Sequence, residues 1–390
     1  MLITQLHSLV NATTQEVLGE TAVIQDDLSN IVDIGKQVID SDNVDSYVKK
    51  LVNHIGKVIF VNRLYSGGVP SVLMDSWEYG SILEKVTADM PTATENKSWD
   101  LNDGEDYSPN VFYKPTVSAK FFNSMVTFEI PMSFTEIQVK QSFSNAAQLN
   151  GFVSMLVTSI ENAMTVRLDA LIMRTITNMA AETLVNGLSG ELDDVIVSTN
   201  STVKAVNLLT LFNADKVAAD KTTKAKALQN PNFIRYAAYT IGLYTERMAK
   251  ISTLFNVGAK ERFTPKDMLH TILLADFAKA SVTFLGADVY NAEHMALPTH
   301  ETVPYWQGSG LAYEFGEISR VNVKTSTNKD VDIDGVLGVM FDRDALGVTN
   351  LERRVTTNYN PKAEFYNNFY KFDAGYYNDL NENFVVFFMG

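Results

Sequence analysis

Two apolar runs stand near the end of the sequence, Val336-Leu-Gly-Val-Met-Phe-Asp342 and Asn383-Phe-Val-Val-Phe-Phe-Met389. Runs of about seven residues rich in β-branched and aromatic side chains are typical of strands buried on both faces. The second run ends one residue before Gly390, the last residue. Because chain ends fray unless they pair into a sheet, we expect both runs to form strands inside a core.

Aromatic side chains are concentrated toward the end of this region. Eleven lie between Tyr359 and Phe388, whereas aromatic residues make up 11% of the whole chain. This is more contact surface than one small domain needs. The segment therefore predicts a part of the molecule that packs against other copies of the chain.

Upstream, Phe143 to Leu184 predict one long helix, and no proline occurs from Met132 to Asn230. One apolar row recurs at spacings of three and four, at Leu149, Val153, Leu156, Ile160, Met164, Leu168 and Leu171. A second row lies on another face, at Phe152, Met155, Ala163, Val166, Ala170 and Met173. The helix would run about 60 Å, and its two apolar sides would have to be sandwiched between other elements.

A protruding hairpin is predicted between this helix and the first part of the chain. It follows the break Gly67-Gly-Val-Pro70 with an extended segment through Val72, Leu73, Trp77 and Ile82 toward Val86. A polar stretch from Pro91 to Pro115 carries five acidic residues, and strand-like sequence returns from Thr116 to Ile130, with Val126, Phe128 and Ile130 on one face. Two strands alone are marginal in water, so this hairpin needs another surface to lie on. The alternative is an ordinary pair of sheet strands with a disordered loop.

The remaining segments divide into an arm and a lobe. Residues 1 to about 45 form the arm, and Ser46 can cap a helix with apolar positions Val48, Leu51, Val52, Ile55 and Ile59. The later region alternates predicted elements: a short strand near Val195, helices from Val203 to Ala219 and from Phe233 to Leu254, a strand from Leu269 to Leu274, a helix from Asp276, and a loop from Pro298 to Gly316. Such alternation predicts one compact α/β lobe.

Length and composition limit the classes of protein that this chain can belong to. A chain of 390 residues is expected to form two or three lobes. Its net charge of −14 argues against tight binding of nucleic acid, which requires Lys and Arg to neutralise phosphates. The absence of cysteine excludes disulfide scaffolds and thiol catalysis. With no signal peptide and no long apolar segment, a soluble protein made in the cytoplasm is expected, with no membrane partner.

Two stretches contain residues that can bind metals, but neither has the right spacing. His294 and His300, with Glu293 and Glu301, match neither a helical pair of zinc ligands nor a zinc finger. Asp330-Val-Asp-Ile-Asp-Gly335 begins like a calcium loop, but Phe341 stands where a bidentate Glu is required. The sequence therefore predicts polar loop residues in the first stretch and a hairpin edge with outward aspartates in the second.

Other chemical signals are weaker still. Gly308-Ser-Gly310 lacks the third glycine of a dinucleotide-binding fingerprint. A mild basic cluster, made of Lys216, Lys221, Lys224 and Lys226, is explained by a solvated helix end, with nucleic-acid binding as a weaker alternative. Asp342-Arg-Asp344 favours turn contacts or salt bridges between subunits over acid–base chemistry. No catalytic residue, cofactor site or metal site is predicted.

The order of these segments resembles the major capsid proteins of tailed bacteriophages, over nearly the whole chain. It is most similar to those of small short-tailed phages of Gram-positive bacteria. The resemblance is carried by four stretches taken in order: Asn53-His-Ile-Gly-Lys-Val58, Asn150-Gly-Phe-Val-Ser-Met-Leu-Val-Thr-Ser-Ile160, Met268-Leu-His-Thr-Ile-Leu-Leu-Ala-Asp-Phe-Ala278 and Gly338-Val-Met-Phe-Asp-Arg-Asp344. The same shell fold occurs in encapsulins and in the floor domains of herpesvirus capsids. A bacterial nanocompartment shell, a metal-dependent enzyme built on residues 290–345, and a tail or portal-type ring remain alternatives.

The resemblance implies an α+β fold with four parts. These are an N-terminal arm and helix (1–65), an extended hairpin loop (66–132), a peripheral domain with the spine helix (133–185 and 336–390), and an axial domain (186–335). It implies a structural protein of the virion, assembled in the host cytoplasm as pentamers and hexamers. The hairpin would lie across a neighbouring subunit. A scaffolding protein and a portal are implied as partners, and the shell would enclose double-stranded DNA without reading its sequence. Any outer decoration would come from another protein.

Overall fold

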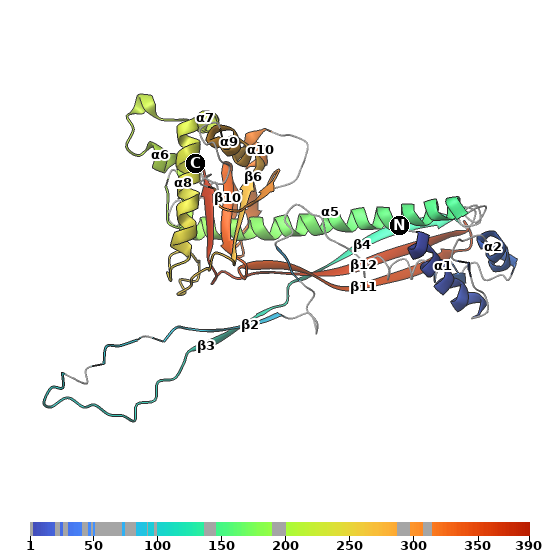
Figure 1. The fold of residues 1–390 in the computed structure, drawn as a ribbon, viewed down its shortest axis with the longest axis horizontal. Helices are drawn as coiled ribbons and strands as arrows, with labels where there is room; N and C mark the ends of the chain where they lie inside the picture. The colour runs from blue at the N-terminus through green and yellow to red at the C-terminus, as the bar shows by residue number, and fades with distance from the viewer. Residues whose placement is uncertain are drawn as a thin grey trace. The chain divides into compact units, whose positions relative to one another are not determined.

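The computed structural model describes residues 3–19, 24–25, 30–40, 46–47, 50, 72–74, 83–91, 93–96, 100–135, 146–188, 200–286, 297–306 and 314–390. The chain forms two compact units, and Figure 1 traces it through both. Unit 1 consists of Met1–Ser76, Met125–Arg174 and Val348–Gly375. Unit 2 consists of Trp77–Ser124, Thr175–Gly347 and Tyr376–Gly390. The predicted α+β class is confirmed.

The centre of unit 2 is a five-stranded sheet. Its strands in order are β5 (Ala205–Asn207), β13 (Phe384–Phe388), β10 (Val336–Asp342), β6 (Leu269–Leu274) and β7 (Glu301–Val303). Strand β10 runs antiparallel to both of its neighbours, while the two edge strands are parallel to theirs. Every residue of β10 and β13 is buried. The two apolar runs are therefore the buried strands that the sequence predicts.

Helices pack against this sheet through one apolar core. They are α6 (Leu208–Asn213), α8 (Pro231–Met248) and α9 (Ala275–Gly286). The ring of Tyr244 on α8 meets that of Phe387 on β13 edge to face, with centroids 5.2 Å apart. Phe233 and Phe277 are completely buried in the same cluster. This core joins segments that are distant in the sequence and holds the helices against the sheet.

Two predicted helices of this region have different bounds from those expected. The bounds predicted for the helix from Val203 to Ala219 are wrong, because residues 205–207 form a strand that pairs with β13. Helix α6 begins after this strand, where the Asn207 side chain caps it by accepting from Thr210 N at 3.1 Å. The helix predicted from Phe233 begins instead at Pro231, since the Asn230 side chain caps it. It ends at Met248, six residues before the expected end. The predicted strand at 269–274 and the helix near Asp276 are confirmed.

Smaller elements complete unit 2. They are a 3-10 turn (Ala218–Asp220), α7 (Lys224–Ala227), α10 (Phe315–Ile318), and the antiparallel pairs β8 (Val321–Lys324) with β9 (Asp330–Ile333) and β2 (Leu83–Ala88) with β3 (Val117–Phe122). Trp306 is buried, and its indole Nε1 donates to the Val336 carbonyl at 2.8 Å. Thr177 Oγ1 in turn donates to the Trp306 carbonyl at 3.2 Å.

A four-stranded sheet lies mainly in unit 1. Its strands in order are β1 (Leu73–Met74), β11 (Leu346–Asn360), β12 (Phe365–Asn378) and β4 (Met125–Thr135). Strands β12 and β4 pair antiparallel over eleven residues, from Phe365 opposite Thr135 to Gly375 opposite Met125. Val126, Phe128 and Ile130 share the less exposed face of β4, as predicted.

This sheet corrects the predicted role of the aromatic segment. None of the eleven aromatic residues between Tyr359 and Phe388 is exposed. Tyr366, Tyr370 and Phe372 are buried almost completely within the chain itself. The prediction that these side chains form a surplus surface for other copies is therefore wrong. These aromatic residues lie on β11, β12 and β13 and pack within this chain.

The predicted spine helix is confirmed as α5 (Ala146–Gly187), which has 42 residues. Ile160, Met164 and Leu168 are buried, as the first apolar row requires. The second row is exposed at Val166 and Ala170, so the middle of the helix is covered on one side only. From Leu171 to Leu184 nearly all side chains are buried, so within the stretch from residue 158 onward, where side chains are described, this part has the sandwiched environment that was predicted.

The first part of the chain contains α1 (Ile3–Leu18) and α2 (Ile31–Asp40). Helix α1 is held to the following segment by His7 Nε2 and Ile24 O at 2.8 Å, and by the Asn11 side chain, which accepts from Ile24 N at 2.9 Å. The helix predicted after Ser46 falls almost entirely outside the described residues. The strand predicted near Val195 lies outside them completely.

We expect Phe387→Ala to lower the free energy of unfolding by about 3–5 kcal/mol, because the change leaves a cavity in a fully buried site. Denaturant unfolding followed by circular dichroism measures this loss. The matched control is Phe112→Ala, at an exposed site, which should change stability by less than about 0.5 kcal/mol. Equal stability of the two variants would contradict the assignment of β13 to the core.

Candidate assembly surface

The β2–β3 hairpin presents a polar face and an apolar face, and the apolar face is the one turned to solvent. Exposure alternates along both strands. The less exposed face contains Leu83, Lys85, Thr87, Ser118, Lys120 and Phe122. The exposed face contains Glu84, Val86, Ala88, Val117, Ala119 and Phe121. Strands that lie on a core normally show the opposite arrangement, so polar contacts, together with the Phe122 ring 5.0 Å from that of Tyr377, hold this hairpin to its own subunit.

Two lysines face each other across the hairpin, because Lys85 and Lys120 are directly paired in its register. Like charges in opposite positions destabilise a pair of strands. Asp379 offsets this repulsion, since one carboxylate oxygen lies 3.0 Å from Lys85 Nζ and the other 2.9 Å from Lys120 Nζ. Its side chain is 1% exposed. A single buried carboxylate therefore makes the register of the hairpin favourable.

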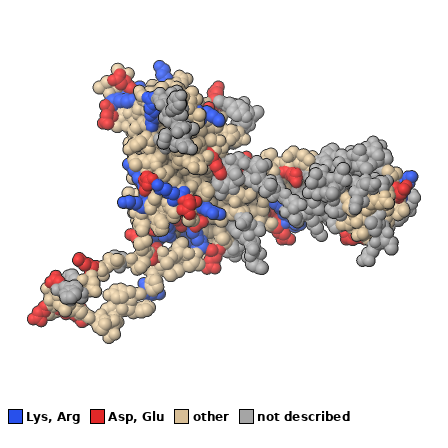
Figure 2. All heavy atoms as spheres, in the orientation of Figure 1, with Lys and Arg blue, Asp and Glu red and all other residues tan. Residues whose placement is uncertain are grey.

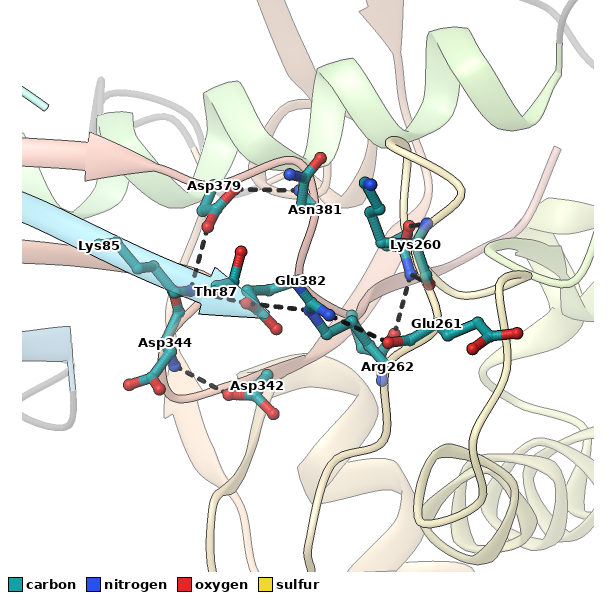
Figure 3. A network of polar contacts seen from close by, with 12 residues as sticks. Lys85, Thr87, Lys260, Glu261, Arg262, Asp342, Asp344, Asp379, Asn381 and Glu382 are labelled. Carbon is teal, nitrogen blue, oxygen red and sulfur yellow. Dashed lines mark hydrogen bonds and ion pairs between the residues drawn. The ribbon is translucent and has the colours of Figure 1, made fainter. Parts of the chain in front are cut away.

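Glu382 is the second acidic partner of the hairpin (Figure 3). Its Oε1 lies 2.7 Å from Lys85 Nζ and 3.4 Å from Arg262 Nε. A third contact joins Lys260 Nζ to the Asp89 carboxylate at 3.4 Å, just after β2 ends. The hairpin base is thus bound to the turn before β13 and to the loop around residue 260.

The two acidic residues lie on the turn between β12 and β13, which the backbone holds rigidly. Asp379 N donates to Ala345 O at 2.7 Å, and the Asp379 side chain accepts from Asn381 N at 3.1 Å. Phe384 N donates to Phe255 O at 2.9 Å as the next strand begins. The carboxylate is therefore oriented before the lysines reach it, which reduces the entropy lost on pairing.

The charges and hydrogen bonds of this network favour the charged states of Lys85 and Asp379. Burial disfavours the charge on Lys85, but hydrogen bonds and attraction from Glu382 and Asp379 outweigh it and raise the pKa of Lys85. Burial also opposes the charge on Asp379, yet Lys120 and Lys85 hold the pKa of that carboxyl below its usual value. In contrast, burial raises the pKa of Glu382 despite its two basic neighbours. Asp379 is consequently the last of these carboxylates to take up a proton as the pH falls.

Beyond the paired strands the hairpin continues as a long exposed tip. Asp89 N donates to Thr116 O at 2.9 Å, and every described side chain from Met90 to Val117 is exposed. Phe112 and Tyr113 are 84% and 85% exposed. Figure 2 shows acidic side chains at the far end of this tip. The tip therefore offers both aromatic and acidic groups to a partner.

The predicted long strand from Thr116 to Ile130 is divided between the β2–β3 hairpin and the four-stranded sheet. It is interrupted at Asn123 and Ser124, after which β4 pairs with β12 instead of β2. The paired part of the hairpin therefore has only six residues in each strand. The predicted acidic and exposed tip is confirmed by the exposure of its described residues.

The candidate metal ligands do not come together in the part of the chain that the structure describes, which contains no group of three or more His, Asp or Glu suited to a metal ion. His300 Nδ1 bonds to Pro298 O at 2.8 Å, and His294 and Glu293 lie outside the described residues. Each aspartate of the 330–334 stretch pairs with a different cation: Asp330 with Lys324, Asp332 with Arg320, and Asp334 with Lys224. Val331 and Ile333 are buried between them, so the predicted hairpin edge is confirmed.

The other sequence signals also find structural explanations. Asp342 accepts from Asp344 N at 2.9 Å, which is the predicted turn contact. In the basic cluster, Lys216 Nζ lies over the Phe212 ring at 3.2 Å from its centroid. Gly308 and Gly310 lie outside the described residues.

Sequence reasoning missed the anchoring network completely. Its acidic members stand in Asp379-Leu-Asn-Glu382, a short polar turn between two strongly apolar segments. Its lysines lie in two strands, and the sequence alone does not show which other segments these strands contact. The available signal was an alternation that places Lys85 and Lys120 on one face of the two strands and Val86, Val117 and Phe121 on the other. Which face pointed inward depended on a turn far away in the sequence.

Among the described residues, no helix combines the length and apolar character needed to cross a membrane. One family model matches residues 10–388, and its description is Phi29-like phage major capsid protein. No curated protein sequence matches the chain.

Several solved phage structures match this chain at low sequence identity. A chain in the structure of the head fibre and inner core protein of native bacteriophage P68 is 9% identical, covers 85% of this chain and 86% of its own length, and has a TM-score of 0.50. The capsid of Staphylococcus phage Andhra is 11% identical, with coverage of 84% and 86% and a TM-score of 0.47. The capsid of Cyanophage P-SCSP1u is 8% identical, with coverage of 84% and 90% and a TM-score of 0.49. The P68 match supports the fold.

We expect Asp379→Asn to loosen the hairpin base, because a hydrogen bond to a charged group contributes about 1.5–3 kcal/mol when it is shielded from water. The contact to Lys120, which is more than a third exposed, contributes less. Hydrogen–deuterium exchange should rise in β2 and β3 and stay unchanged in β10. The control Glu246→Gln breaks the exposed pair with Lys266 and should not alter exchange. Unchanged protection of β2 and β3 in Asp379→Asn would rule out the anchoring role.

The anchoring by Asp379 should also depend on pH in a defined direction. Because its pKa is lowered in the folded state, it contributes stability above the unfolded value of about 3.9 and loses it as the pH falls through the folded value. The difference in unfolding free energy between the wild type and Asp379→Asn should be constant from pH 7 to 5 and shrink near pH 3. Paired urea titrations at these pH values measure it. A difference that disappears already at pH 5 would contradict the lowered pKa.

Proposed function

Because this chain belongs to the Phi29-like phage major capsid protein family, we propose that its copies close a phage head as rings of five and of six subunits. The chain is a structural protein of the virion capsid that forms the head with copies of itself, and it is not an enzyme. Membership of this family favours a phage head over a bacterial nanocompartment.

The observation that carries this proposal is the hairpin with its exposed tip. A segment that exposes Phe112 and Tyr113 almost fully is unfavourable for an isolated subunit, because apolar surface gains free energy when it leaves water. A hairpin that lies across a neighbouring subunit removes this surface from water. Contacts that differ on the two partners generate rings when the rotation between subunits closes. Many such contacts together hold each subunit, so each one can be weak.

We assign the segments to four roles. Residues 1–65 form an N-terminal arm, and 66–132 form the loop that reaches the neighbour. Residues 133–185 and 336–390 form a peripheral domain with the spine helix, and 186–335 form the axial domain that meets its copies around five-fold and six-fold positions. The ion pairs of the hairpin base join the loop to the peripheral part at Asp379, which pairs with Lys120, and to the axial part at Lys260, which pairs with Asp89.

The remaining partners follow from the same function. A head encloses double-stranded DNA, and the net charge of −14 is consistent with a wall that does not retain it. We propose a scaffolding protein that sets the curvature during assembly and a portal at one vertex. Electron microscopy of the expressed protein tests the arrangement. Closed shells with rings of five and six support it, whereas a single fixed ring size would contradict it.

Deleting Pro91 to Ser108 should impair assembly without unfolding the subunit. The deletion removes exposed tip residues and leaves the paired strands β2 and β3 and the Asp379 anchor in place. We expect a melting temperature within a few degrees of the wild type and a large loss of shells on sedimentation and in negative-stain images. Global unfolding of the variant would show that the tip belongs to the subunit core. Normal shells would show that it does not join neighbours.

A further inference from the structure

The outer face of the hairpin is a small apolar surface with one acidic group. Val86, Val117 and Phe121 are 60%, 58% and 64% exposed, and on the same face Ala119 pairs with Val86 and Ala88 pairs with Val117. Glu84 lies beside Phe121 at one end of the same face. The inner face is occupied by the ion pairs to Asp379 and Glu382, so the outer face is the side from which a partner can approach.

A second exposed apolar surface lies in the same unit, on the loop after α8. Ser252 and Arg262 form an antiparallel bridge, with hydrogen bonds of 3.0 and 3.1 Å, so Ile251 and Phe263 stand opposite each other on the side away from Arg262. Arg262 points inward, to Glu382. Ile251, Leu254 and Phe263 are 48%, 57% and 50% exposed. Lys250, which is also exposed, adjoins this surface.

The two surfaces are complementary in chemistry. Each consists of about three large apolar side chains, and each has one exposed charge at its border, Glu84 on the hairpin and Lys250 on the loop. Apolar pairing supplies the attraction, while the charges fix the register and orientation of the contact. A single subunit cannot form this contact within itself, because the ion pairs of Lys85 hold the inner face of the hairpin against the turn at Asp379 and Glu382, and the Lys260–Asp89 pair holds the hairpin base to its own loop.

We infer that the outer face of the hairpin of one copy packs, head to tail, on the Ile251–Leu254–Phe263 surface of the next copy. The inference rests on the proposed function, in which the hairpin lies across a neighbour, and it names both contacting surfaces. Because the two surfaces differ and lie on one chain, the contact repeats from copy to copy in the same direction. This is the heterologous type of interface that builds rings.

Cysteine cross-linking tests this contact directly, since the natural chain has no cysteine. Ala119→Cys places a thiol at the centre of the outer face, and Thr253→Cys places one on the loop surface. The two single variants carry tags of different mass and are co-expressed, so that a disulfide between them must join two copies. We expect a covalent dimer of mixed mass in the shell fraction after mild oxidation. The control pairs Thr253→Cys with Ser118→Cys, on the inner face of the hairpin, and should give at least ten-fold less of this dimer.

The outcomes separate this inference from the proposed function. Shells with rings of five and six that give no mixed dimer, even with a short bifunctional maleimide, would overturn the inference and leave the function intact. Failure of the parent chain to form such shells would instead count against the proposed arrangement. Maleimide labelling of the Ala119→Cys variant adds a further test. We expect fast labelling of free subunits and at least ten-fold slower labelling in shells. Slow labelling in both states would mean that the chain covers this face with its own residues, which overturns the inference.

A charge exchange provides a second test that does not depend on cysteine placement. Glu84→Lys and Lys250→Glu each place like charges together, and we expect each to reduce the yield of shells several-fold. The double variant restores opposite charges and should recover most of that yield. Thermal unfolding of the free subunits checks that both single variants remain folded. If both single variants fold and assemble like the wild type, or if the double variant is no better than either, the inferred contact is wrong.

Discussion

Asp379 imposes the constraint on which the hairpin depends. Lys85 and Lys120 oppose each other in the register, and their repulsion would destabilise the strand pair. The buried Asp379 carboxylate attracts both lysines, and this attraction outweighs the repulsion. The acid can do this because its turn is fixed on one side by β12 and on the other by the buried strand β13. The core of the subunit thus determines, through these ion pairs, where the hairpin is held.

The polarity of the hairpin divides two tasks between its faces. Ion pairs hold the inner face to the subunit, where direction and register matter more than the amount of buried surface. The outer face and the tip keep the apolar and aromatic side chains that a partner can bury. Such exposed strands would favour aggregation in a free subunit, and acidic residues in the tip oppose it by mutual repulsion. A head protein needs this balance, because it must stay dispersed until it assembles.

Sequence patterns predicted the elements whose side chains follow one simple period. The runs at 336–342 and 383–389 and the long helix were found because each is apolar enough to be buried wherever it packs. Prediction failed where a distant partner decides the outcome. Residues 205–207 are a strand because β13 lies beside them, and β4 leaves the hairpin because β12 offers eleven pairing positions. The aromatic residues after Tyr359 were misread for the same reason, since composition measures how much surface a segment buries but not which chain covers it. The network around Asp379 could not be predicted, because its members come from three separated parts of the chain.

The connection between the hairpin anchor and β13 has a mechanical consequence. Tension on the hairpin passes through Lys85 and Lys120 to the turn at Asp379 and Glu382, and from there into a strand hydrogen-bonded on both sides. Strands loaded along their length must break several hydrogen bonds at once before they slide. A shell under internal pressure would therefore transmit its load into the most resistant layer of each subunit, and the ion pairs would yield before the sheet does.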